Sequence, residues 1–182
     1  MVEPIVLDAS AALAILRAEP SAGPVRQIIR DHLEADGALI VPDHFWLEVV
    51  NVLVRRHGHD VTDAVEAVRD LDEIGVASIE IDRPLLLLTL GWIAAADLTA
   101  YDAAYLALAE SADARLLTLD GRLGAAAGAR SVLRVPADSR PVSPRRTSEV
   151  GAAYGRSAGG GGPPGFGPYL AALREKASAG TR

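Results

Sequence analysis

Four acidic residues stand at positions where carboxylates could do chemistry. Asp8 and Asp120 each come directly after a short apolar run. Glu48 lies early in the stretch that follows another such run, and Asp102 heads an apolar helical stretch. Each residue by itself could cap a helix or a turn. If all four meet in space, their mutual repulsion raises their pKa values unless a cation offsets the charge.

A hard divalent cation is the partner that such a group of carboxylates favours. Mg²⁺ and Mn²⁺ prefer carboxylate and water oxygens as ligands. A cation held there can lower the pKa of a bound water and neutralise charge on a phosphodiester during in-line attack. The four acids therefore point to a metal-dependent nuclease, and metal binding without catalysis is the simpler alternative.

The apolar runs before these acids are typical of buried parallel strands. Five stretches are strand candidates: residues 5–7, 38–41, 76–81, 115–119 and 132–135. The carboxyl ends of parallel strands lie along one edge of a sheet, and ligand sites form there. We therefore expect the four acids, which are far apart in sequence, to converge at that edge.

Helical patterns alternate with the strand candidates. They cover residues 11–17, 25–34, 44–56, about 61–74, 84–96, 102–111 and 122–127. Pro20 and Gly23-Pro24 are expected to break the chain between the first two helices. Asp43 is predicted to cap the third helix, Asp60 or Thr62 to open the fourth, and Val61 to lie on its buried side. This alternation predicts an α/β fold, a three-layer α/β/α sandwich with a central parallel sheet.

Asp102 also has a purely structural explanation. Thr99 can be the N-cap of the apolar helix and Asp102 its N3 residue, which together form a weak capping box. The positive end of the helix dipole would stabilise a carboxylate at that place. Taken alone, the position of Asp102 favours capping over catalysis.

The composition excludes several classes of protein. The chain has no cysteine, which rules out disulfides and thiolate sites and fits a reducing cytoplasm. Its single lysine, Lys176, lies in the tail, and no Gly-Lys-Ser/Thr step of a phosphate-binding loop is present. The longest uncharged apolar stretch, residues 84–96, is too short to span a bilayer, and no signal peptide is apparent. We expect a cytoplasmic protein with no membrane partner.

The last part of the chain differs in composition from the rest. Residues 137–182 are rich in Gly, Pro, Ser and Arg and carry a net charge of +4, which leaves −10 on residues 1–136. Such a segment cannot bury enough apolar surface to order itself. We predict a folded domain over residues 1–136 and a disordered tail over residues 137–182, which serves as a solvated linker or touches RNA.

Four segments that contain the acids resemble the PIN-domain family, and most closely the VapC-type ribonuclease toxins of bacterial toxin–antitoxin pairs. These segments are Asp8-Ala9-Ser10, residues 48–53, residues 99–109 with Tyr101-Asp102-Ala103-Ala104-Tyr105, and Thr118-Leu119-Asp120. The resemblance spans roughly residues 2–136, in the family's order and spacing. The tail has no counterpart in it.

The resemblance implies cleavage of RNA phosphodiesters with Mg²⁺ or Mn²⁺. Asp8, Glu48, Asp102 and Asp120 would be both the catalytic and the metal-binding residues. It also implies a homodimer that is held inactive by a cognate VapB-like antitoxin, whose C-terminal segment covers the acidic groove. An antitoxin arginine could compete with the metal there.

Several other residues are candidates for supporting roles. Ser10 and Thr118 could hydrogen-bond the acids or a metal-bound water, and Asn51 lies one helical turn after Glu48 and could orient it. Arg17 and Arg122 are possible phosphate contacts. The aromatic residues Trp46, Trp92, Tyr101 and Tyr105 are expected in the core or an interface, and His57 and His59 lack a third ligand for zinc.

The sequence as a whole predicts a metal-dependent endoribonuclease of a type II toxin–antitoxin system. The alternative is a catalytically silent PIN-like module that binds RNA or an antitoxin. A nucleotide-binding α/β protein is a third possibility, against which the absence of a Gly-rich loop after the first strand argues.

Overall fold

A sheet of four parallel strands forms the centre of the folded part. The computed structural model of the chain describes residues 2–56 and 60–132. The strands are β1 (Ile5–Leu7), β2 (Leu39–Pro42), β3 (Val76–Ile79) and β4 (Arg115–Leu117), in the order β3-β2-β1-β4. Every neighbouring pair is parallel, which confirms the predicted parallel sheet.

Burial distinguishes the central strands from the edge. All residues of β1 and β2 are buried, whereas β3 buries only Val76. Ile5 of β1 pairs with Leu39 on one side and with Arg115 on the other. Short apolar runs without polar alternation suit strands that are covered on both faces, which is how the sequence specifies the middle of the sheet.

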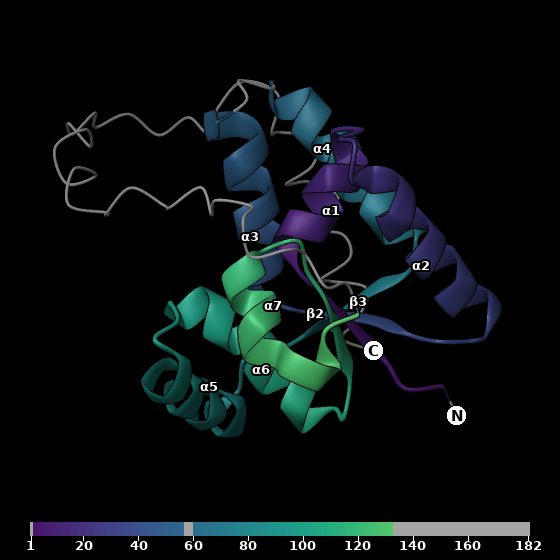
Figure 1. The fold of residues 1–182 in the computed structure, drawn as a ribbon. Coiled ribbons are helices and arrows are strands. Elements are labelled where there is room, and N and C mark those ends of the chain that lie inside the picture. The colour runs from purple at the N-terminus through teal and green to yellow at the C-terminus, as the bar shows by residue number, and fades with distance from the viewer. Residues whose placement is uncertain (1, 57–59, 133–182) are drawn as a thin grey trace, which may run out of the picture. The chain divides into compact units, whose positions relative to one another are not determined.

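Seven α-helices flank the sheet in the described part of the chain. They are α1 (Ala9–Leu16), α2 (Ala22–Glu34), α3 (His44–Asn51), α4 (Val61–Glu73), α5 (Arg83–Ala96), α6 (Ala100–Ser111) and α7 (Gly121–Ala127). Figure 1 shows α1, α2 and α4 on one side of the sheet and α5, α6 and α7 on the other. The predicted three-layer α/β/α sandwich is confirmed.

Helix α6 packs directly on the sheet, against β1, β2 and β4. Its residues 103–109 are all buried, and four of these seven are alanines, whose small side chains allow a close approach to the strands. The helix begins at Ala100 rather than at Asp102, because Thr99 is its N-cap. The predicted buried helix and its N-cap are confirmed, and Asp102 binds back to the hydroxyl of Thr99 instead of the backbone N–H that a capping box uses.

One predicted helix start and one predicted helix cap are wrong. Helix α2 begins at Ala22, so Gly23 and Pro24 lie inside its first turn instead of before it. Proline is tolerated there because its missing N–H has no intrahelical acceptor in the first turn. Asp43 precedes α3 with helical backbone angles, and its side chain makes no capping hydrogen bond.

The ends of two other elements also differ from the prediction. Helix α3 stops at Asn51 and continues as a π-helical turn, Val52–Arg56, where an α-helix was expected. Strand β4 stops at Leu117 instead of Leu119, because the N–H of Leu119 donates to Ser10 Oγ at 2.9 Å and not to a neighbouring strand.

Helix α4 follows its predicted start. The Asp60 side chain caps it by accepting a hydrogen bond from the N–H of Asp63 at 2.9 Å, as one of the two alternatives predicted. Val61 is 48% exposed and not on the buried side, which corrects the prediction for this residue. As the first residue after the cap it precedes the face that packs inward through Ala64 and Leu71.

Some predictions fall outside the described residues. These are the turn at residues 57–59, the domain boundary at residue 136 and the tail over residues 137–182. The predicted last strand, residues 132–135, is described only at Val132, whose N–H donates to the Leu116 carbonyl of β4 at 2.8 Å.

No single helix of the described residues is long and apolar enough to cross a membrane. Helices α5 and α6 meet the requirement for length and composition only when taken together, and they meet at a bend of 115°.

Candidate active site

Asp8 lies at the carboxyl end of β1, where it is the N-cap of α1 and only 4% exposed. Its Oδ2 accepts hydrogen bonds from the backbone N–H and the hydroxyl of Ser10. The same oxygen accepts a hydrogen bond from Thr118 Oγ1 at 2.7 Å. Since Thr118 follows β4, these contacts join the ends of the two adjacent strands β1 and β4.

Asp120 is connected to Asp8 by hydrogen bonds to the same threonine, Thr118. The N–H of Asp120 donates to Thr118 Oγ1 at 2.9 Å, so one hydroxyl connects the two aspartates. Asp120 is the N-cap of α7, and its Oδ1 accepts from the backbone N–H groups of Arg122 and Leu123 at 2.7 and 2.9 Å. Local capping thus orients this carboxylate at the edge of the sheet.

Asp102 is held in the first turn of α6 by its N-cap. Thr99 Oγ1 donates to Asp102 Oδ2 at 2.8 Å and accepts from the Asp102 N–H at 3.1 Å. The structural explanation from the sequence is therefore correct for one carboxylate oxygen. No hydrogen bond from a described residue reaches the other oxygen, Oδ1, which is equally true of Asp8 Oδ1 and Asp120 Oδ2.

Glu48 enters the site through a tyrosine. On α3 its Oε2 accepts a hydrogen bond from the hydroxyl of Tyr105 at 2.9 Å. Tyr105 lies on α6 and is fully buried. Burial raises the pKa of Tyr105, and the charges of Asp8 and Glu48 raise it further, so both acids act on this hydroxyl.

Asn51, the third predicted supporting residue, is exposed at the end of α3. No hydrogen bond of its side chain is described, whereas Ser10 and Thr118 both contact Asp8 directly.

The carboxylates act on one another electrostatically. Burial raises the pKa of Asp8 above its ordinary value of 3.8, the hydrogen bonds from Ser10 and Thr118 oppose this, and the charge of Asp102 adds to it. Burial also raises the pKa of Asp102, with the Thr99 hydrogen bond opposing, the Asp120 charge adding and the Arg122 charge opposing. The three aspartates therefore share one region of negative potential.

The carboxylate oxygens of these acidic residues are the type of ligand that a hard divalent cation prefers. Each aspartate has one oxygen held by local hydrogen bonds and one that no described residue engages, and burial, with a smaller contribution from a neighbouring carboxylate, raises the pKa of Asp8 and of Asp102. Within residues 2–56 and 60–132, however, no three side chains of Asp, Glu or His are gathered closely enough to form a ready metal site. The four acids lie along the same edge of the sheet, but their side chains do not converge on a single position that a metal ion could occupy.

Two residues that contact the candidate site, Tyr105 and His44, were not predicted from the sequence to do so. Tyr105 was assigned to the core or an interface, and its burial is as expected, but the contact of its hydroxyl with Glu48 was not foreseen. His44, on the first turn of α3, packs its ring against Tyr101 and Tyr105 with centroids 5.5 and 5.0 Å apart. Burial lowers the pKa of His44 and so favours the neutral form of its ring. Its place one turn before Glu48 was the available signal.

Residues 5–129 of the sequence match the PIN domain family. The chain belongs to this family. No curated protein sequence matches the chain.

Solved structures share the architecture of this PIN domain. VapC20 of Mycobacterium tuberculosis, a toxin that cleaves the sarcin–ricin loop, is 22% identical with a TM-score of 0.55 over 72% of this chain and 98% of its own. PAE2754 from Pyrobaculum aerophilum is 26% identical with a TM-score of 0.50, over 68% of this chain and 79% of its own. A toxin–antitoxin complex from Klebsiella pneumoniae is 18% identical with a TM-score of 0.53, over 72% and 98%. At these identities the likeness concerns the fold.

Proposed function

We propose that this PIN domain is an endoribonuclease, the toxin of a type II toxin–antitoxin system, which hydrolyses RNA phosphodiesters in the cytoplasm. The observation that carries the proposal is the coupling of acidic side chains at the carboxyl edge of the sheet. The charge of Asp102 acts on Asp8 and that of Asp120 acts on Asp102, and the Tyr105 hydroxyl binds Glu48 and is affected by the charge of Asp8. Carboxylates that repel one another in a structural role alone would be costly, whereas a nuclease uses them.

The proposal assigns Asp8, Glu48, Asp102 and Asp120 to the binding of Mg²⁺ or Mn²⁺. When bound, such a cation supplies a water of lowered pKa and offsets charge on the phosphodiester. The chain's own groups orient the ligands. Ser10 and Thr118 hold Asp8 Oδ2, Thr99 holds Asp102 Oδ2, and Tyr105 holds Glu48 Oε2, and these contacts limit how far each carboxylate can turn.

We propose two protein partners. One is a VapB-like antitoxin whose C-terminal segment covers the acidic edge, where an antitoxin arginine would pair with the carboxylates. The toxin–antitoxin complex from Klebsiella pneumoniae, which has the same fold, supports this proposal.

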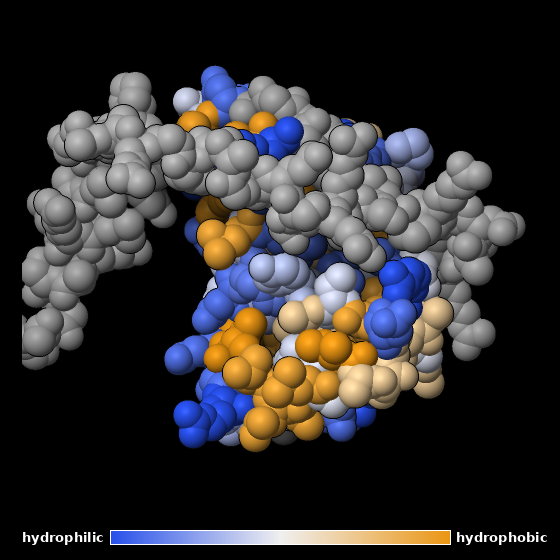
Figure 2. Space-filling view, turned by 90° about the vertical axis from the view of Figure 1, so that its left-hand side faces the viewer, coloured by the Kyte–Doolittle hydropathy of each residue, from blue (hydrophilic) through white to orange (hydrophobic). Residues whose placement is uncertain are grey.

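The second partner is another copy of this chain. Helix α5 exposes Leu86, Leu87 and Leu90 by 49, 63 and 53%, and Figure 2 shows apolar side chains gathered on the face of the molecule where α5 lies. Exposed apolar patches of this kind mark association sites. A two-fold axis would place the same leucines of both copies against each other.

Cleavage of total cellular RNA tests the proposed activity. We expect the purified, antitoxin-free protein to cut RNA with Mg²⁺ or Mn²⁺ and not with EDTA. Asp102→Asn, which removes the charge but keeps the hydrogen bond to Thr99, should lose the activity. Asp113→Asn just after α6 is the matched control, because Asp113 is exposed and its side chain pairs with Arg130 away from the four acids.

The result also decides between the two candidate functions. Cutting that needs metal and Asp102 supports the nuclease, and mapping the ends identifies the RNA that is cut. If folded protein cuts no RNA in any metal, the proposal of a nuclease is wrong, and binding of RNA or antitoxin by a silent module becomes the better explanation.

A further inference from the structure

Arg122 is a basic residue built into the acidic edge. It is the second residue of α7, and its backbone N–H donates to Asp120 Oδ1 at 2.7 Å. Its charge lowers the pKa of Asp102, which lies in the first turn of α6. Arg122 therefore binds Asp120 through its backbone, and its charge acts on Asp102.

The side chain of Arg122 spans from α7 to the corner between α5 and α6. Its Nη2 donates to the backbone carbonyl of Asp97 at 2.7 Å, and Asp97 ends α5 in a left-handed conformation with φ of 51°. The Asp97 carboxylate is 4.0 Å away and fully exposed, so it contributes little to holding the guanidinium. The carbonyl is the main contact that sets the direction of the side chain.

Most of the donors of this guanidinium are available. Arginine has five N–H donors in a planar fork, and the contact with Asp97 engages Nη2 alone. The side chain is 58% exposed, and no other hydrogen bond of its guanidinium is described. A planar fork with open donors matches the oxygens of a phosphate.

The negative net charge of the domain makes a basic residue near the acids useful for binding RNA. Residues 1–136 carry a net charge of −10, so a polyanion is repelled as it approaches the acids. Arg17, the other arginine that the sequence suggested for phosphate, is paired with Glu19. The Arg122 guanidinium instead binds a neutral backbone carbonyl, and the carboxylate with which it pairs among the described residues, that of Asp97, is 4.0 Å away and fully exposed.

We propose that Arg122 binds a phosphate of the RNA next to the bond that is cut, while the Asp97 carbonyl holds its guanidinium in place. This inference rests on the proposed nuclease function, and it assigns to the Arg122 guanidinium the binding of the RNA substrate at the candidate active site. A purely structural role, tying α7 to the corner of α5 and α6, is the alternative that an experiment must separate.

RNA binding separates the two roles. The Asp102→Asn protein, in Mg²⁺, is titrated into a short fluorescein-labelled single-stranded RNA, with and without Arg122→Ala. We expect Arg122→Ala to weaken binding about tenfold, as for loss of one charge-assisted contact. The slope of log affinity against log salt should fall by about 0.7, the value for one phosphate contact on a single strand. Arg122→Lys should keep the salt slope but bind less tightly than arginine.

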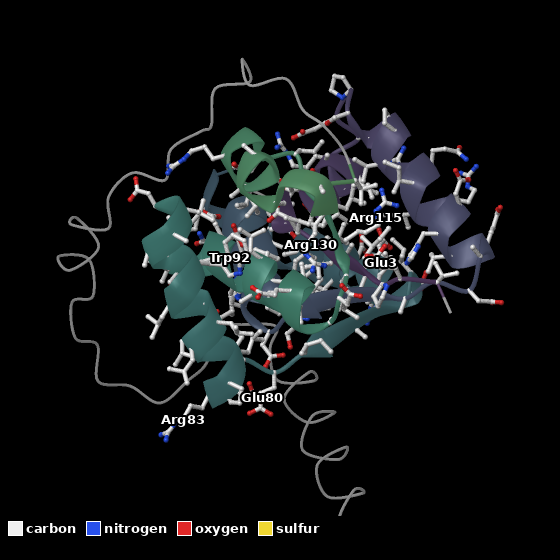
Figure 3. The ribbon with its side chains drawn as sticks, turned by 60° about the horizontal axis from the view of Figure 1, so that its bottom comes forward. Glu3, Glu80, Arg83, Trp92, Arg115 and Arg130 are labelled. Carbon is white, nitrogen blue, oxygen red and sulfur yellow. The ribbon has the colours of Figure 1, made fainter. Side chains whose placement is uncertain are left out.

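Arg115→Ala is the matched control. Arg115 is the first residue of β4 and so lies at the amino end of the strand, away from the acids at the carboxyl ends. Figure 3 shows Arg115 near Arg130 and Glu3. Its loss lowers the net charge equally and should leave RNA affinity within about twofold. Arg122→Gln removes the charge while keeping an amide donor for the Asp97 carbonyl, and serves if the alanine variant does not fold.

Cleavage by the otherwise unchanged protein completes the test. Arg122→Ala should raise KM about tenfold with a smaller change in kcat, and its unfolding midpoint should stay near that of Arg115→Ala. If affinity, salt slope and KM match those of Arg115→Ala, the inference is overturned even though the protein cuts RNA. If the unmutated protein cuts no RNA but binding still depends on Arg122, the nuclease proposal fails and the phosphate contact stands.

Discussion

Replacing Tyr105 by phenylalanine removes one oxygen from the middle of the candidate site. The hydroxyl of Tyr105 donates to Glu48 Oε2 at 2.9 Å, and the ring around it is fully buried. Because phenylalanine keeps the ring and its packing, the variant should fold as before. What it loses is the hydrogen bond that joins α6 to α3 at the acidic edge.

The size of the effect follows from the two partners. A hydrogen bond to a charged group contributes about 1.5–3 kcal/mol to stability. Glu48 is only half-buried and can regain water, and phenylalanine has no hydroxyl to desolvate, so we expect a loss of about 1–2 kcal/mol. For a domain of this size that lowers Tm by roughly 4–7 °C. The loss of this donor removes one of the contacts that orient Glu48, and cleavage should fall about tenfold.

A double-mutant cycle in denaturant measures the contact directly. The proteins are wild type, Tyr105→Phe, Glu48→Ala and the double variant, and we expect a coupling energy above about 0.5 kcal/mol. Tyr101→Phe is the control, because Tyr101 is 65% exposed and no hydrogen bond of its hydroxyl is described. It should change stability by less than about 0.5 kcal/mol. Additive effects of Tyr105→Phe and Glu48→Ala would refute the reasoning.

Three further outcomes are expected. Burial raises the pKa of Asp8 and of Asp102 above 3.8, so the folded protein holds protons that the unfolded chain has released. The stability that these carboxyls contribute is greatest below pH 3.8 and falls as pH rises through their folded pKa, so in metal-free buffer Asp102→Asn should lose less Tm than wild type between pH 4 and pH 7. Thr118→Val removes the hydroxyl that connects Asp8 and Asp120 and should lower stability by about 1–2 kcal/mol in denaturant. Leu87→Asp on α5 should convert a dimer into a monomer in light scattering after size exclusion.

Each of these predictions has a control within the chain. A parallel pH dependence of wild type and Asp102→Asn would contradict the raised pKa of that carboxyl. Thr62→Val on the exposed side of α4 should be nearly neutral, and an equal effect at both threonines would argue against the bridging hydroxyl. Val61→Asp puts the same charge on an exposed residue away from α5, and a monomeric wild type would show that the leucines of α5 do not mediate dimerisation.

The carboxylates show where prediction from the sequence succeeds. Asp8 and Asp120 follow apolar runs, and parallel strands bring such positions to one edge whatever the details of packing. Thr99 and Asp102 are three residues apart, so their capping hydrogen bonds depend on local geometry alone. Placement of these residues could therefore be predicted before any contact was known.

Local rules also failed at particular places. Gly23 and Pro24 were expected to stop a helix, but a proline in the first turn lacks only a hydrogen bond that would not form anyway. Leu119 was assigned to a strand on its apolar character, and its N–H instead donates to Ser10, more than a hundred residues earlier in the chain. A contact at that distance along the chain leaves no periodic trace in the sequence.

The sequence alone determined where most strands and helices lie, though not all of their ends, together with the parallel α/β architecture and the edge at which Asp8, Asp102 and Asp120 stand, because burial periodicity, capping and strand direction are local properties. Only the tertiary structure decided that Thr118 bridges two aspartates, that Tyr105 holds Glu48 and that Arg122 reaches the Asp97 carbonyl. Those contacts depend on how α3, α6 and α7 pack on the sheet. Side-chain packing sets them to within an ångström, and residue type and spacing do not encode it.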